Sequence, residues 1–139
     1  MIIQDIYLES YDWCVRVYYA VTEYYINNIL MDLLELECDK DVFFNVKSLM
    51  ESHTKNVGFT YTNADKRESL VLIGITTDAS EFQNTYDHEK GHLATHISKA
   101  LGINPYGEEY QYLTGERGKC MFKEAQKLLC DDCRKHLII

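Results

Sequence analysis

The chain has 139 residues, of which 46% are hydrophobic, so it can bury the core of one compact domain but has no room for a separate substrate-binding domain. Its 22 acidic residues outnumber the 14 basic ones and give a net charge of −8, which argues against a general nucleic-acid-binding protein. We find no uncharged apolar run near the roughly 20 residues that span a bilayer, and no signal-peptide pattern at the start. We therefore expect one cytoplasmic domain over residues 1–139, without a membrane or direct nucleic-acid partner.

The first part of the chain is predicted to be a helical lead-in, residues 1–55. Within residues 11–37 the apolar residues form a wide stripe at helical spacing, which predicts one long core helix. The stripe consists of Trp13, Val17, Ala20, Val21, Tyr24, Tyr25, Ile29 and Leu33. The acidic segment 39–41 offers an N-cap for a second helix over about residues 40–53.

The middle of the chain changes character and predicts a β-hairpin over about residues 57–76. Val57–Thr62 alternates and is rich in β-forming residues, and Ser69–Thr76 is a second such run. The residues between them, 63–67, are polar turn material. A small antiparallel sheet is therefore expected to precede the rest of the domain.

A long helix is expected directly after the hairpin. Ser80 or Asp78 can cap its start near Glu81, and the pattern continues to Leu101. Gly102 stands in the position where a left-handed residue ends a helix. The residues expected to face the core are Phe82, Thr85, Leu93, Ile97 and Leu101.

Two further helices complete the predicted fold. The first runs from about Tyr106 to Glu116, where Gly115 and Gly118 mark its end, and the second covers about residues 119–136. The last helix is expected to bury Met121, Phe122, Ala125, Leu128 and Leu129. The prediction is thus an α+β domain, mostly helical, with one small sheet.

The segment with the most specific chemistry is His88-Glu89-Lys90-Gly91-His92, inside the long helix. Two histidines four residues apart lie one turn apart on the same helix face, so both imidazoles can reach one metal ion. Glu89 then lies beside the metal, where it can accept a proton from a bound water molecule. The spacing predicts a Zn²⁺ site with His88 and His92 as ligands and Glu89 as the catalytic base.

A catalytic zinc site needs a third protein ligand, and three residues are candidates. His96 is eight residues from His88, about 12 Å along a helix, so one ion cannot bind both. Glu108 and Glu109 open the next helix, which is expected to pack back on the histidine helix. We prefer Glu108, whose helix face continues into a glycine, and keep Glu109 as the alternative.

These residues resemble a family, the small zincin-like metallopeptidase-type proteins of phages and mobile elements in gut Bacteroidetes-type bacteria. The matching segments lie within residues 57–118 and are Gly58–Thr62, Arg67 before the strand Ser69–Ile75, Glu81–Thr85, His88–Leu93 and Gly107–Gly115. The resemblance implies a minimal gluzincin core with His88, His92 and Glu108 as zinc ligands and Glu89 as base. It implies no substrate.

We therefore predict a zinc-dependent hydrolase, most simply a metallopeptidase acting on a peptide or protein substrate in the cytoplasm of a bacterial host cell. Tyr112, with Tyr61 and Tyr86 as alternatives, is the candidate for stabilising the transition state. One alternative is a catalytically silent zincin-like protein that acts by binding, for example as an acidic inhibitor of a host defence protein. Another is a structural phage component with a vestigial site.

The five cysteines, an odd number in a domain large enough to need no covalent staples, are expected to be reduced thiols. Cys130, Cys133 and His136 share a spacing found in zinc and redox sites. No second cysteine pair completes four ligands, so a half-buried pair of thiols on a helix is the expectation.

Overall fold

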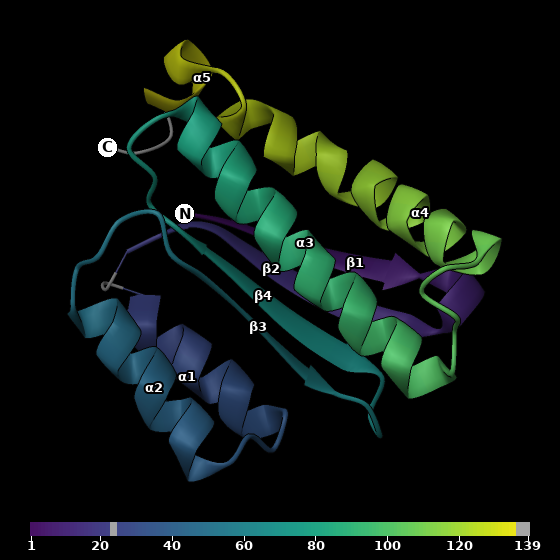
Figure 1. The fold of residues 1–139 in the computed structure, drawn as a ribbon. Coiled ribbons are helices and arrows are strands. Elements are labelled where there is room, and N and C mark those ends of the chain that lie inside the picture. Colours follow the sequence, from purple (N-terminus) through teal and green to yellow (C-terminus); the bar gives the residue numbers. More distant parts are fainter. Residues whose placement is uncertain (23–24, 136–139) are drawn as a thin grey trace.

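In the computed structural model, which describes residues 1–22 and 25–135, a four-stranded sheet lies between two layers of helices (Figure 1). The spatial order of the strands is β1 (Ile2–Leu8), β2 (Trp13–Val21), β4 (Glu68–Gly74), β3 (Gly58–Asn63). The β2–β4 pair is parallel, and the two outer pairs are antiparallel. The α+β class is confirmed, but the sheet is mixed and larger than the predicted hairpin.

Helices cover both faces of this sheet (Figure 1). One layer consists of α1 (Ile26–Glu35) and α2 (Lys40–Glu51), and the other of α3 (Ala79–Leu101) and α4 (Glu108–Ala125). The short elements are the 3₁₀ turns η1 (Glu9–Tyr11) and η3 (Gln126–Leu128) and the helix α5 (Asp131–Lys135). Each layer encloses its own hydrophobic cluster against the sheet, so the central strands β2 and β4 are buried on both sides.

The predicted long helix over residues 11–37 is wrong in its first half, which is strand β2. Trp13, Val15 and Val17 are buried while Cys14 is exposed, the alternation of a strand. From Tyr18 onward every residue of β2 is buried, because helices cover both faces. A strand with no polar face shows no period of two, so its apolar spacing also fits a helix. Among the described residues of the predicted range, only 26–35 form an α-helix, and Tyr24 lies outside the described residues.

The second helix, the hairpin and the long third helix are confirmed. Asp39 caps α2 by accepting a hydrogen bond from the Val42 amide at 2.9 Å. Asp78 caps α3 by accepting from the Glu81 amide at 2.8 Å. Gly102 ends α3 with φ of 68°, the left-handed conformation that glycine adopts without strain.

The two helices predicted after Gly102 run together as α4 only as far as Ala125, and the rest of the second predicted helix is divided into η3 and α5. Gly115 and Gly118, expected to separate them, lie inside α4, where a Cβ at either position would meet no atom within 4 Å. A glycine inside a helix costs only about 1 kcal/mol. The packing of α4 against β1 and α3 offsets this cost. Met121, Ala125 and Leu128 are buried as predicted.

The prediction of burial is wrong for Phe122 and Leu129, which are 55% and 37% exposed. They follow buried neighbours by one position and so turn away from the sheet. His136 lies outside the described residues. None of the helices in the described part of the chain is long and apolar enough to cross a membrane.

Candidate functional site

His88 and His92 point toward one another on the exposed side of α3. Their Nε2 atoms are 3.0 Å apart, and their rings meet edge to face with centroids 4.6 Å apart. Two Zn–N bonds of about 2.05 Å at a tetrahedral angle place the nitrogen atoms about 3.3 Å apart. The pair therefore fits two ligand positions of one zinc ion after a shift of a few tenths of an ångström.

Glu89 lies on the neighbouring face of α3, turned toward the edge strand β3. It is 4% exposed, and its Oε2 accepts a hydrogen bond of 2.6 Å from the Thr60 hydroxyl. A Cβ on Gly58 would lie 2.7 Å from Glu89 Cγ, so only glycine leaves space for this carboxylate. Two residues of β3 thus hold the Glu89 carboxylate between helix and edge strand.

His96, the third histidine of the row, belongs to a chain of hydrogen bonds that crosses the sheet. Trp13 Nε1 donates to Ser69 Oγ at 2.9 Å, Ser69 and Thr62 hydroxyls are 2.7 Å apart, and Thr62 Oγ1 lies 3.0 Å from His96 Nδ1. Because the indole N–H can only donate, the chain is satisfied throughout when Ser69 donates to Thr62 and Thr62 donates to His96. Nδ1 of His96 is then an acceptor and is not available to a metal.

Burial lowers the pKa of His96 below its usual value of 6.5, and the positive charges of His92 and Lys99 lower it further. The folded state therefore binds fewer protons than the unfolded state below about pH 6.5. We expect the free energy of unfolding to fall as the pH drops from about 7.5 to about 5.5, and His96→Gln to lose this dependence. Urea unfolding at both pH values measures the effect, and an unchanged slope in His96→Gln would contradict it.

The structure does not bring Glu108 or Glu109 to the histidine pair. Glu89 and His96 contact Thr60 and Thr62 of β3, whereas α4 packs against α3 and β1, at the opposite edge of the sheet (Figure 1). Both glutamates are exposed in the first turn of α4. Burial raises the pKa of Tyr11, beyond the end of β1, and the negative charges of Glu116 and Glu109 raise it further, which places Glu109 on that far side.

The length of α3 also separates Glu108 from the histidine pair. His92 precedes the end of α3 at Leu101 by nine residues, or about 14 Å, and Glu108 follows that end. In residues 1–22 and 25–135, no three histidine, cysteine, aspartate or glutamate side chains lie close enough together to hold a metal ion. In this part of the chain, His88 and His92 therefore have no third such side chain close enough to complete a metal site with them.

The three candidate tyrosines are separated from one another. Tyr112 is 70% exposed on α4, and Tyr61 packs into the cluster under α1 and α2. Tyr86 is buried, with its ring stacked on Phe82, and burial raises its pKa to about 12. The structure gives none of them a contact with the histidine pair.

Sequence reasoning missed the residues of β3 that support the site, Gly58, Thr60 and Thr62. Their signal was present, because alternate positions of this strand carry small or hydroxyl side chains while Phe59 and Tyr61 face the other cluster. The sequence does not show that α3 packs over β3, so the role of these residues could not be predicted from it. A comparison of the chain with protein-family models, with curated proteins and with solved structures gave no match.

Proposed function

We propose that the protein is a zinc-dependent hydrolase of peptide bonds, with His88 and His92 as zinc ligands and Glu89 as the general base. The observation that carries the proposal is the convergence of two imidazole nitrogens, 3.0 Å apart, next to a buried carboxylate on the same helix. A buried carboxylate beside two exposed histidines is costly for a structural helix, and such a cost is typical of a functional site.

Each group has a defined part in this proposal. Zn²⁺, when bound, would supply Lewis acidity and bring the pKa of a bound water toward 7. Thr60 donates to Oε2 of Glu89 and so orients the carboxylate, which in this proposal takes up a proton and passes it to the leaving amine. The carboxylate is held on the β3 side, so the reacting peptide bond is expected between α3 and β3.

The edge strand β3 supports a peptide as the substrate class. In the described residues β3 pairs only with β4, so its second edge has no strand partner. An extended peptide can add to such an edge through main-chain hydrogen bonds. The peptide would then run alongside Glu89, the proposed base.

A catalytically silent, acidic binding protein is the second candidate. The distance of Glu108 and Glu109 from the histidine pair favours it, because catalytic zinc sites usually have three protein ligands. The net charge of −8 is compatible with a basic surface on a host protein as its partner.

Zinc titration of the metal-free chain by calorimetry tests the metal site. We expect about one Zn²⁺ per chain, and a loss of affinity of more than roughly 100-fold in His88→Ala, because a direct ligand matters more than its supporting residues. Glu108→Ala is the matched control and should bind zinc like the unmodified chain. Absence of zinc binding would favour the silent binding protein, and a loss in Glu108→Ala would contradict the two-histidine arrangement.

A further inference from the structure

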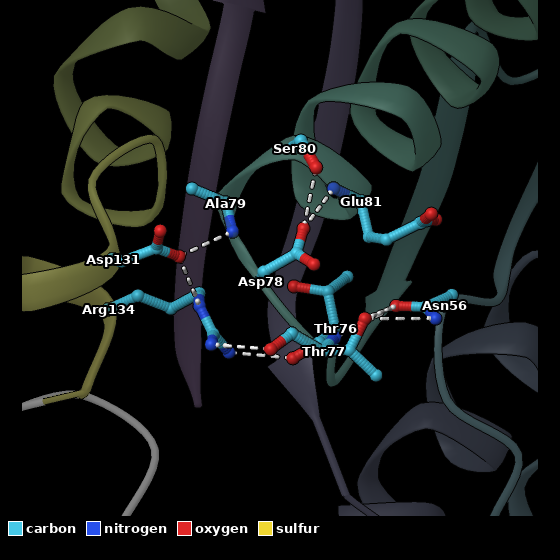
Figure 2. Close-up of polar contacts among 9 residues, drawn as sticks. All are labelled: Asn56, Thr76, Thr77, Asp78, Ala79, Ser80, Glu81, Asp131 and Arg134. Atoms are coloured by element: carbon cyan, nitrogen blue, oxygen red, sulfur yellow. Dashed lines mark hydrogen bonds and ion pairs between the residues drawn. The ribbon is translucent and has the colours of Figure 1, made fainter.

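The short helix α5 is fastened to the segment that begins α3 (Figure 2). Asp131 Oδ1 accepts a hydrogen bond of 2.8 Å from the Ala79 amide. Arg134 donates from Nη1 to the Thr76 carbonyl at 2.6 Å and from Nη2 to the Thr77 carbonyl at 2.8 Å. We call these three bonds the α5 clamp. They join residues more than 50 positions apart in the sequence and hold the start of the histidine helix.

Two exposed cysteines lie within the same turn of chain as the clamp residues. Cys130 directly precedes α5, and its carbonyl accepts the first helical hydrogen bond, from the Arg134 amide at 2.8 Å. Hydrogen bonding with the backbone of Cys133 and Asp132 and with the Cys133 side chain lowers the pKa of Cys130, while hydrogen bonding with Cys130 raises the pKa of Cys133.

We propose that Cys130 and Cys133 form a redox-active dithiol that exchanges with small-molecule disulfides, and that its oxidation tightens the α5 clamp. The proposal goes beyond the zinc site and does not depend on it. It rests on two exposed thiols three residues apart at the first turn of α5, and on the position of both cysteines beside Asp131 and Arg134.

Helix geometry permits the intramolecular disulfide. Residues three apart in an α-helix have Cα atoms about 5 Å apart. Disulfides usually join residues with Cα separations of about 4.4–6.8 Å, so the bond needs little backbone movement. α5 has only five residues, far fewer than an isolated helix needs in water. A covalent link across its first turn therefore removes open conformations and keeps Asp131 and Arg134 in place.

The exchange takes place in two balanced steps. The Cys130 thiolate attacks one sulfur of a disulfide such as oxidised glutathione, forms a mixed disulfide and releases the other half as a thiolate. Cys133 then loses its proton to solvent, attacks the Cys130 sulfur and expels the second thiolate. The protein loses two protons and two electrons in all, and the small disulfide takes up the same number to become two thiols.

Treatment of the full-length chain with oxidised glutathione, followed by acid quenching, alkylation and peptide mass spectrometry, tests the site. We expect a Cys130–Cys133 disulfide to form at least about tenfold faster than modification of Cys14. Cys14 is the internal control, since it is also exposed but its pKa is raised by burial and by nearby carboxylates. Cys133→Ser should accumulate glutathione on Cys130, and Cys130→Ser should react more slowly. Equal rates at Cys14 and Cys130, or no internal disulfide, would overturn the proposal.

Hydrogen exchange of the segment 76–82 tests the effect on the clamp. The amides of this segment should exchange more slowly in the oxidised chain than in the reduced chain, because the Ala79 amide donates to Asp131. In the double variant Asp131→Ala with Arg134→Ala, which lacks all three bonds of the α5 clamp, the two redox states should exchange alike. Identical exchange in the oxidised and reduced unmodified chain would overturn the control of the clamp by oxidation. Neither measurement involves zinc, so a result that overturns the dithiol proposal is distinct from one that overturns the hydrolase proposal.

Discussion

Replacement of Glu89 by glutamine should lower the rate of peptide hydrolysis by roughly 10²–10⁴-fold, the contribution typical of a general base. Glutamine keeps the length of the side chain and still accepts the hydrogen bond that Thr60 donates to Oε2. It cannot take up the proton. The expected result is thus a loss of turnover with zinc affinity retained. A mixture of unstructured synthetic peptides, followed by mass spectrometry, measures the cleavage.

The matched control for this prediction is Thr60→Val, which leaves the carboxylate of Glu89 in place but removes its orienting donor. Its loss of activity should be smaller than that of Glu89→Gln, and Thr60→Ser should restore it. Cleavage by Glu89→Gln at the full rate would exclude Glu89 as the base. Cleavage by neither the unmodified chain nor its variants, with zinc bound, would favour the silent binding protein.

The parts of the fold that could be predicted from sequence are those with local signals. α3 has an aspartate cap at Asp78 and a glycine stop at Gly102, and both act in the structure as expected. The hairpin is recognisable because strands β3 and β4 flank a polar turn. Such signals depend on neighbours in the sequence and need no knowledge of what packs above or below.

The wrong predictions concern segments whose secondary structure is determined by tertiary packing. From Tyr18 onward β2 is buried between two helical layers, so this half of the strand gives no alternation that would separate it from a helix. Its parallel partner β4 follows some 50 residues later, and no local sequence pattern predicts this pairing. In α4 the glycines at 115 and 118 resembled stops, but tertiary packing carries the helix through them.

The candidate site also has one part that could be predicted from local sequence and one part that depends on tertiary packing. The convergence of His88 and His92 follows from helix geometry alone, because residues four apart share a face. A ligand from the next helix depends on which side of α3 that helix packs. The sequence favoured a return toward the histidines, whereas α4 packs against α3 and β1, at the other edge of the sheet.

Replacement of Trp13 by alanine should give the largest loss of stability, about 3–5 kcal/mol, because its fully buried indole fills the core between β2 and the α3–α4 layer. Trp13→Phe keeps most of the ring but removes the N–H that donates to Ser69 Oγ, so it should cost less, about 1–3 kcal/mol. Urea unfolding followed by circular dichroism measures both, since Trp13 is the only tryptophan and fluorescence is lost with it.

Ser69→Ala separates the two contributions of this indole. It retains the ring but leaves the buried N–H without its acceptor, and it breaks the chain that ends at His96. We expect a loss similar to that of Trp13→Phe and a double variant, Trp13→Phe with Ser69→Ala, that is less destabilised than the sum of the two, because the shared hydrogen bond can be lost only once. Additive losses would show that the indole stabilises the fold by packing alone.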